Sequence, residues 1–229
     1  MENGRARFHH AHCQRLLADA RALGLPAPDP KEITEAFSVL GQAEFGRGSG
    51  IIRIRAWAGT SGESVLVGEP RPLDPEPPSW RAGIAPFAHP GPGDHPGVKL
   101  THHPELERAR SLRVRTELDE ILLFDARGGL VEGVRSSLVL VDSDGTWHSP
   151  GAEMGGVASI ALAIARERSP IPIEPALSIS RERIARAQEL IALNAVRGAR
   201  PITEIEGQAI ANGEPGPVSR TLERLLEAD

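Results

Sequence analysis

The chain has 229 residues, of which 40% are hydrophobic and 25% are charged, a composition typical of a globular protein with one or two domains. Its net charge of -5 argues against a general nucleic-acid-binding protein, and no apolar run is long enough to cross a membrane, so neither partner is expected. The first residues lack the apolar core of a signal peptide and Cys13 is the single cysteine, so we expect a cytoplasmic protein without an internal disulfide.

The first part of the chain predicts two helices followed by a β-hairpin. Apolar side chains recur at helical spacing in residues 9–23, and residues 31–42 form a second predicted helix. Residues 51–59 alternate in polarity as a strand does, and residues 64–69 are the expected hairpin partner. We therefore predict a small N-terminal α/β lobe over residues 1–71.

A proline-rich segment follows this lobe. Residues 69–78 contain five prolines, a density that predicts no regular structure, and we assign the linker to residues 72–79. A larger C-terminal α/β lobe is predicted over residues 80–229, which makes the fold class mixed α/β (α+β) with two unequal lobes. Its predicted strands are 82–88, 120–126, 137–143 and 190–194, and its predicted helices are 104–115, 156–167, 180–190 and 221–228.

Lysine is rare in this sequence. Only Lys31 and Lys99 stand among 26 basic residues, and Lys99 directly follows a Gly/Pro-rich segment, residues 89–97. An amine can lose its proton and attack a carbonyl carbon, which a guanidinium does not do. Lys99 is therefore a candidate catalytic residue, although the residue alone fits a solvated surface charge better.

Five short segments, taken together, carry a family resemblance. In chain order they are RFHHAHCQRLL, GVKL, LVEGVRSSLVLV, MGGVAS and LNAVRGARPI. Their order and spacing resemble the class IV, fold-type IV enzymes that use pyridoxal 5'-phosphate. These include branched-chain and D-amino-acid aminotransferases and 4-amino-4-deoxychorismate lyase. The resemblance runs from about Phe8 to the C-terminus and implies a two-lobed fold, a homodimer and a small-molecule amino substrate.

The resemblance also implies roles for individual residues. Lys99 matches the Schiff-base lysine that moves the substrate proton, and Glu132 matches the carboxylate that keeps a proton on the pyridine nitrogen. Arg15 matches an arginine that grips the cofactor phosphate, and Arg53 matches a contact to a substrate carboxylate. Further phosphate-binding positions are implied at two turns, Gly156, Val157 and Ala158 at a helix start and Asn194 and Ala195 at the second turn. Taken singly, Glu132 is also compatible with an ordinary turn carboxylate and Arg15 with a solvated helix arginine.

Several positions depart from the family pattern. Ala158 and Ala195 lack the hydroxyl groups that usually bind the phosphate, Ser137 replaces a common asparagine, and the family's first strand is expected to be absent. These departures predict weak cofactor binding and leave a non-catalytic homologue as one alternative. The NAVRGARPI segment is closer to the lyase branch than to the Gly-Thr-Ala-Ala turn of branched-chain enzymes. A lyase is therefore favoured, with an amino-acid aminotransferase as the alternative.

A cluster of potential metal ligands lies in the first predicted helix. His9, His10, His12 and Cys13 are residue types that bind zinc, but on one helix these four positions fan around the axis and cannot all meet one ion. We predict no metal site, and His12 matches a histidine common in the corresponding helix of the family.

Overall fold

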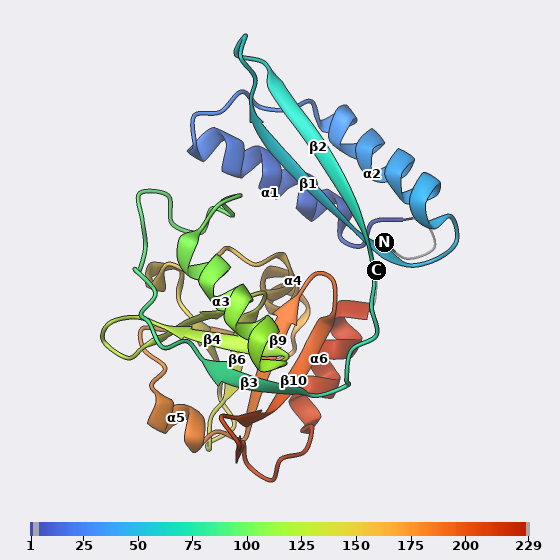
Figure 1. Ribbon diagram of the computed structural model, residues 1–229. Helices are drawn as coiled ribbons and strands as arrows, with labels where there is room; N and C mark the ends of the chain where they lie inside the picture. The colour runs from blue at the N-terminus through green and yellow to red at the C-terminus, as the bar shows by residue number, and fades with distance from the viewer. Residues whose placement is uncertain (2–4, 228–229) are drawn as a thin grey trace. The chain divides into compact units, whose positions relative to one another are not determined.

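The computed structural model describes residue 1 and residues 5–227, and it consists of two compact units, Met1–Glu76 and Pro77–Ala228 (Figure 1). The division falls inside the proline-rich residues 69–78. Residues 2–4 and 228–229 lie outside the described part, and with them the outer ends of both predicted lobes and the last residue of the predicted terminal helix.

The N-terminal unit is a β-hairpin covered by two helices. Its elements are α1 (His9–Ala22), α2 (Pro30–Phe45), β1 (Gly50–Ala58) and β2 (Ser64–Pro72). The helices meet the strands in one apolar cluster whose buried members are Cys13, Leu17, Ile33 and Phe37, with Ile52, Ile54 and Leu66 packed against them. Asp29 caps α2 by accepting the Lys31 N–H at 2.8 Å, and Pro30 follows at a position where no N–H is required. The sequence therefore predicted this unit's elements correctly, apart from their ends.

Strand β2 extends further than the sequence predicted. Residues 70–72 were expected to be irregular, yet they continue the antiparallel ladder, with Pro70 opposite Ile52 and Pro72 opposite Gly50. Both prolines occupy alternate positions of a strand that has a single neighbour, so both ring nitrogens can face away from that neighbour. Proline density alone was therefore a poor guide to where this strand ends.

The C-terminal unit is built on one mixed sheet of nine strands within the described residues. The strands run in the order β5-β4-β3-β10-β9-β6-β7-β8, and the short β11 pairs with β10. Their bounds are β3 (Trp80–Ile84), β4 (Glu120–Phe124), β5 (Leu130–Gly133), β6 (Ser137–Val141), β7 (Trp147–Pro150), β8 (Ile173–Ala176), β9 (Glu189–Asn194), β10 (Gly198–Ile205) and β11 (Gln208–Ala209). Strand β5 lies at one end of this order and also contacts β7, so the sheet is curled.

Strand β4 is buried on both faces, which explains its unbroken apolar run. Leu122 and Phe124 point into the main core, whereas Ile121 and Leu123 join a second cluster with side chains of the helix α3 (Pro104–Thr116). Residues that alternate along a strand face opposite sides of a sheet, so both sides of β4 are covered. The structure confirms the predicted mixture of α and β elements.

Helix α3 matches the predicted helix 104–115, whereas the later helices of this unit differ from the prediction in length and position. These are the short 3-10 helix η1 (Ala152–Met154), α4 (Ile160–Arg168), α5 (Arg181–Ala185) and α6 (Pro217–Glu227). Helix α5 is shorter than predicted because Glu189 and Leu190 belong to β9, where pairing with β6 and β10 overrides local helix preference. Of the strands that the sequence missed, β5, β7, β8 and β11 are short, and β7, β8 and the longer β10 each contain a proline.

Candidate active site

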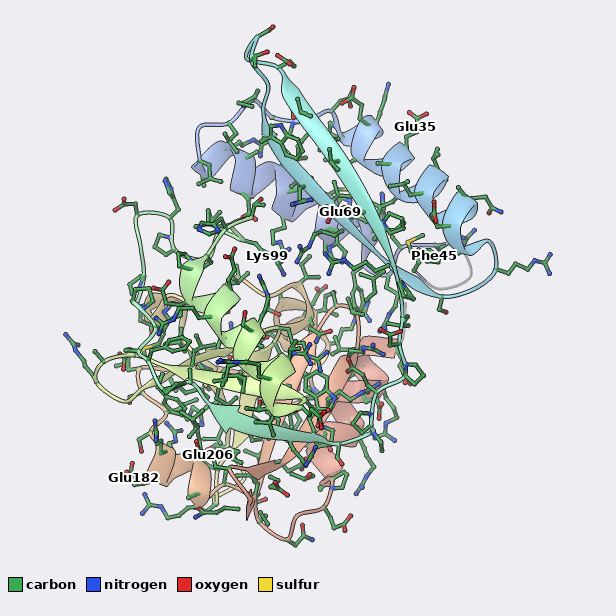
Figure 2. All side chains as sticks on the ribbon, viewed as in Figure 1. Glu35, Phe45, Glu69, Lys99, Glu182 and Glu206 are labelled. Atoms are coloured by element: carbon green, nitrogen blue, oxygen red, sulfur yellow. The ribbon has the colours of Figure 1, made fainter. Side chains whose placement is uncertain are left out.

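Lys99 lies in the irregular segment between β3 and α3 (labelled in Figure 2). Two contacts fix this segment against the chain that precedes α4. The Ala158 N–H donates to the Gly97 carbonyl at 2.8 Å, and Gly155 packs so closely that an added Cβ would lie 2.3 Å from the carbonyl carbon of Gly91. Gly97 has a φ of 81°, a conformation that glycine adopts readily. The segment that carries the lysine is therefore anchored two residues before Lys99, whose side chain is exposed.

Glu132 is buried in β5, where it pairs with Leu123 of β4. Its Oε2 atom accepts the Val157 N–H at 3.0 Å. Burial raises the pKa of Glu132 to about 7, while the Val157 hydrogen bond and the charge of Lys99 both act in the opposite direction. The other oxygen, Oε1, is buried without a hydrogen-bond partner within the described residues. Glu132 thus presents an unsatisfied acceptor in the neighbourhood of a lysine, which suits a donor such as a protonated ring nitrogen.

His89 faces this unsatisfied oxygen, and the sequence did not indicate it. Its side chain is fully buried, and its Nε2 atom lies 3.8 Å from Glu132 Oε1. The only available signal was that His89 begins the Gly/Pro-rich segment, which is too weak to assign a role.

A second buried carboxyl group, Glu120, lies beside the first. The Ser136 hydroxyl donates to Glu120 Oε2 at 2.5 Å and the Ile121 N–H donates to Oε1 at 2.9 Å. Burial raises the pKa of Glu120 to about 7 despite these two donors, and the negative charge of Glu120 in turn raises the pKa of Glu132. A glutamate at the start of an otherwise apolar strand is a visible signal in the sequence.

The helix predicted to begin at Gly156 begins later, whereas the phosphate-binding role of Gly156, Val157 and Ala158 stays a prediction. Helix α4 begins at Ile160, with Ser159 as its cap, so these three residues precede the helix in a segment without regular secondary structure. The Val157 and Ala158 N–H groups donate to Glu132 and Gly97 respectively. In this structure the two N–H groups organise the site and already have protein acceptors.

Asn194 and Ala195 form the turn between β9 and β10. The Asn194 Oδ1 atom accepts the N–H groups of Val196 and Arg197 at 3.0 and 2.7 Å, so the side chain builds the turn. Ser137, at the start of β6, pairs with Leu193, the residue before this turn.

Arg15 and Arg53 belong to the N-terminal unit. Arg15 lies on α1 with its Nε atom 3.9 Å from Asp19, and Arg53 lies on β1 directly opposite Glu69. Glu69 also pairs with Arg55 and lies 3.7 Å from Arg71. The C-terminal unit by itself therefore brings together Lys99, Glu132 and the Gly156–Ala158 segment, and the two arginines are positioned by the other unit.

The histidines of α1 make local contacts. His9 Nε2 lies 3.6 Å from Cys13 Sγ, and the rings of His9 and His12 pack near Phe37. His10 lies 3.5 Å from Gln14 on the exposed side. In the described part of the chain, no three His, Cys, Asp or Glu side chains lie close enough to hold a metal ion.

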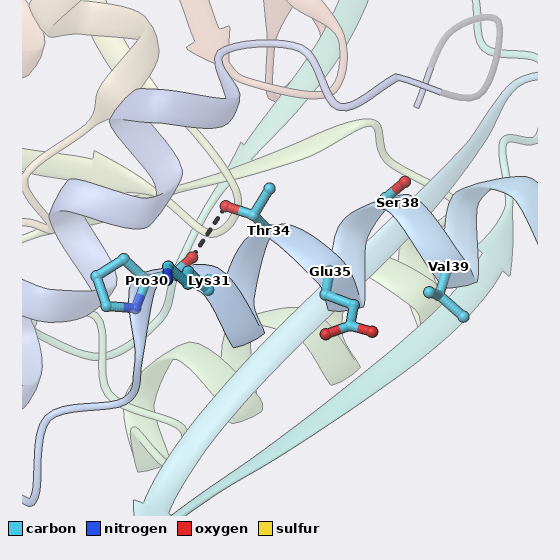
Figure 3. A pocket seen from close by; sticks show the side chains of 6 residues that line it. All are labelled: Pro30, Lys31, Thr34, Glu35, Ser38 and Val39. Carbon is cyan, nitrogen blue, oxygen red and sulfur yellow. Dashed lines mark hydrogen bonds between the residues drawn. The ribbon is translucent and has the colours of Figure 1, made fainter.

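A shallow hollow lies on the outer face of α2 (Figure 3). It is lined by Pro30, Lys31, Thr34, Glu35, Ser38 and Val39. The single hydrogen bond drawn there joins the Thr34 hydroxyl to the Pro30 carbonyl. Since one helix supplies every lining residue, the hollow is a groove between its own side chains, and we assign it no function.

Comparison with known proteins identifies the family. The amino-transferase class IV model matches residues 1–205, so the chain belongs to this family of pyridoxal-phosphate-dependent transferases and lyases, as the resemblance predicted. No curated protein sequence matches the chain.

Solved structures share the fold at low sequence identity. A Legionella pneumophila protein assigned as a 4-amino-4-deoxychorismate lyase has a TM-score of 0.85 and 18% identity, covering 99% of this chain and 87% of its own. A mutant branched-chain amino acid aminotransferase from Thermobaculum terrenum has a TM-score of 0.80 and 23% identity, with 97% and 76% covered. A hypothetical aminotransferase from Mycobacterium tuberculosis in its PLP-bound form has a TM-score of 0.82 and 17% identity, with 99% and 85% covered. The predicted fold type IV is thereby confirmed.

No helix within the described residues is both long enough and apolar enough to cross a membrane.

Proposed function

We propose that this chain binds pyridoxal 5'-phosphate and acts as a lyase of the aminodeoxychorismate type, which releases pyruvate and forms 4-aminobenzoate. The observation that carries the cofactor assignment is the buried Oε1 atom of Glu132, an acceptor without a partner within the described residues, in a site that also contains Lys99. Bound there, the cofactor would supply an aldehyde for covalent attachment and a ring that accepts electrons from the substrate.

Two residues of the C-terminal unit have separate proposed roles at the pyridine ring of the cofactor. Glu132 holds a proton at the ring nitrogen, because the buried carboxylate accepts that N–H and stabilises the positive charge. Lys99 is the covalent attachment point, and its amine removes and returns the substrate proton next to the amino-bearing carbon. The Val157 N–H keeps the Glu132 side chain in place at 3.0 Å. The residues expected around the cofactor ring, Glu132 and Lys99, therefore fit the cofactor well.

The phosphate end fits less well. Ala158 and Ala195 have no hydroxyl group, and the Val157 and Ala158 N–H groups are bonded within the protein. Arg15, from the N-terminal unit, is the remaining charged group proposed to hold the phosphate. We therefore expect weaker binding than in relatives that have both hydroxyls, and a protein purified without added cofactor should be largely empty.

The choice of lyase rests on the turn after β9. Asn194 forms that turn with its own side chain, and the NAVRGARPI sequence is closer to the lyase branch than to the branched-chain branch. We further propose a homodimer as the assembly. Light scattering at micromolar concentration tests it, and a monomer would count against it.

The activity is tested by a parallel assay. Aminodeoxychorismate is supplied and pyruvate and 4-aminobenzoate are measured, beside a panel of L- and D-amino acids with 2-oxoglutarate. We expect turnover of aminodeoxychorismate. Turnover of amino acids alone would assign an aminotransferase. Activity in neither assay, with no visible absorption in excess cofactor, would favour a non-catalytic homologue that has lost the cofactor.

Lys99→Arg and Lys31→Arg are matched variants for this assay, since they exchange the chain's two lysines for the same residue. Lys99→Arg keeps the charge but removes the nucleophilic amine, so activity should be lost. Lys31→Arg, on the outer face of α2, should retain it. Full activity of Lys99→Arg would refute the catalytic role.

A further inference from the structure

His89 is held rigidly in the C-terminal unit. It follows β3, and its backbone N–H donates to the Phe124 carbonyl at 2.7 Å, which extends the contact between this part of the chain and β4. Its ring is completely buried and stacks on His103, with the ring centroids 5.4 Å apart. A buried imidazole held on several sides has little freedom to turn.

The ring's surroundings decide which nitrogen carries the proton. The Gly91 N–H donates to Nδ1 at 3.1 Å, so Nδ1 is an acceptor and the proton of the neutral ring lies on Nε2. Burial lowers the pKa of His89, and the neighbouring His103 lowers it further, while Glu105 and Asp125 act in the opposite direction. A neutral ring with one donor is therefore the form favoured near neutral pH.

That donor points to the acceptor that Glu132 leaves open. Nε2 of His89 and Oε1 of Glu132 are 3.8 Å apart, and both atoms are buried without a hydrogen-bond partner within the described residues. The separation is about 1 Å longer than a hydrogen bond, so a small movement of the carboxylate would close it. A carboxylate oxygen has two lone pairs and can accept from a histidine and from a second donor at once.

The other groups around Glu132 cannot take this role. The Val157 N–H binds the opposite oxygen, Oε2. Lys99 and Arg110 lower the pKa of Glu132 by their charge, and Glu120 raises it. None of these groups donates a hydrogen bond to Oε1 within the described residues.

We propose that His89 is a positioning residue for Glu132: its Nε2–H holds the Oε1 side of the carboxylate in place while that carboxylate engages the ring nitrogen of the cofactor. This inference rests on the proposed function, because the cofactor supplies the ring nitrogen. It also predicts a property of the protein without cofactor. The Nε2–H dipole favours the ionised form of Glu132 whether or not a ligand is present.

Two substitutions distinguish this role from an alternative one, in which His89 only supports the backbone at Gly91 by accepting its N–H. In His89→Asn, the amide oxygen can still accept the Gly91 N–H, but the shorter side chain no longer reaches Glu132. In His89→Gln, the amide N–H takes the place of Nε2–H and reaches Glu132, while the acceptor for Gly91 is lost. If His89 positions the carboxylate, His89→Asn should be the more damaging variant. If His89 only supports the backbone at Gly91, His89→Gln should be the more damaging one.

The first measurement uses the full chain without cofactor. The Glu132 carboxyl is titrated by 13C NMR and is assigned by its absence from Glu132→Gln. We expect His89→Asn to raise the titration midpoint of Glu132 by about half a pH unit and His89→Gln to leave it close to that of the unsubstituted protein. The same midpoint in His89→Asn and the unsubstituted protein would overturn the proposal.

The second measurement is the affinity for pyridoxal 5'-phosphate, followed by visible absorbance. We expect His89→Asn to bind about tenfold more weakly and His89→Gln to stay within about threefold of the unsubstituted protein. Weakening by His89→Gln but not His89→Asn would assign His89 to loop support and overturn the proposal. If the unsubstituted protein binds no cofactor, the proposed function fails, and the carboxyl titration still tests His89.

Near-ultraviolet circular dichroism reports whether the variants fold. If they do not, 15N NMR of the His89 ring in the unsubstituted protein replaces them. The inference requires a protonated Nε2 and an unprotonated Nδ1, with the Nε2 signal shifting on addition of cofactor. The opposite tautomer, or an Nε2 signal that does not move, would overturn it.

Discussion

Glu120 gives the protein a pH-dependent stability that a single substitution, Glu120→Gln, should remove. The carboxyl group is completely buried, and burial raises its pKa from an ordinary value of 4.5 to about 7. The folded protein therefore keeps a proton on Glu120 that the unfolded chain releases near pH 4.5. Its stabilising contribution is fully present below pH 4.5 and is lost as the pH rises through about 7.

The magnitude follows from this difference in pKa. Each unit of difference in pKa corresponds to about 1.4 kcal/mol of unfolding free energy, so the stability lost when Glu120 ionises is about 3 kcal/mol in total. About 2 kcal/mol of this is lost between about pH 5 and pH 8. Glutamine carries no charge at either pH and can still accept the Ile121 N–H. Raising the pH over this range should therefore increase the stability of Glu120→Gln relative to the unsubstituted protein by about 2 kcal/mol.

Urea unfolding measured by tryptophan fluorescence checks this prediction. Trp80 and Trp147 are buried in the C-terminal unit, so a Trp57→Phe background confines the signal to that unit. The matched control is Glu174→Gln, which neutralises an exposed strand glutamate of the same unit and should show no such pH dependence. A stability difference for Glu120→Gln that stays constant between about pH 5 and pH 8 would refute the reasoning.

Two further predictions concern packing and an ion pair. Gly133→Ala should destabilise the protein by about 1–3 kcal/mol, because the added Cβ would lie 2.6 Å from the Ser136 hydroxyl oxygen. The control is Gly93→Ala, whose added Cβ has no atom within 4 Å, and this variant should be nearly neutral in the same urea titration. Asp142→Asn should cost at most about 1 kcal/mol near neutral pH, since solvent screens its partly exposed contact with Arg183. That hydrogen bond to Arg183 lowers the pKa of Asp142 below its ordinary value of 3.8, so the cost should disappear once the pH falls below this lowered pKa. An equal cost at neutral pH and in strong acid would contradict this origin.

The sequence predicted most of the fold because periodicity reports burial. Residues 9–23 and 51–59 matched α1 and β1 closely, since each buries one face against a single partner layer. The prediction failed where tertiary pairing decides the conformation. Glu189 and Leu190 fit a helix by local pattern, but they are strand residues because two neighbouring strands pair with them.

The sequence indicated the two residues that we propose for the cofactor chemistry, and it did not indicate the buried residues beside them. Lys99 and Glu132 were found because their chemistry is rare in this chain or tied to a motif. His89 could not be found in the same way, because its contact with Glu132 is a distance across the sheet that no spacing in the sequence reveals. Glu120 had a weak signal, as a glutamate at the start of an otherwise apolar strand. The Gly156–Ala158 segment was misread as a helix start because glycines begin turns and helices alike, whereas here Ser159 provides the cap.

The central claim is that Lys99 bonds covalently to pyridoxal 5'-phosphate, and borohydride reduction of the protein with added cofactor, followed by peptide mapping, tests it most directly. The chain has only two lysines, so a tagged peptide carries either Lys99 or Lys31. We predict a tag on the Lys99 peptide, which disappears in Lys99→Arg and persists in Lys31→Arg. An untagged Lys99 peptide, with no visible absorption in the presence of excess cofactor, would contradict the claim.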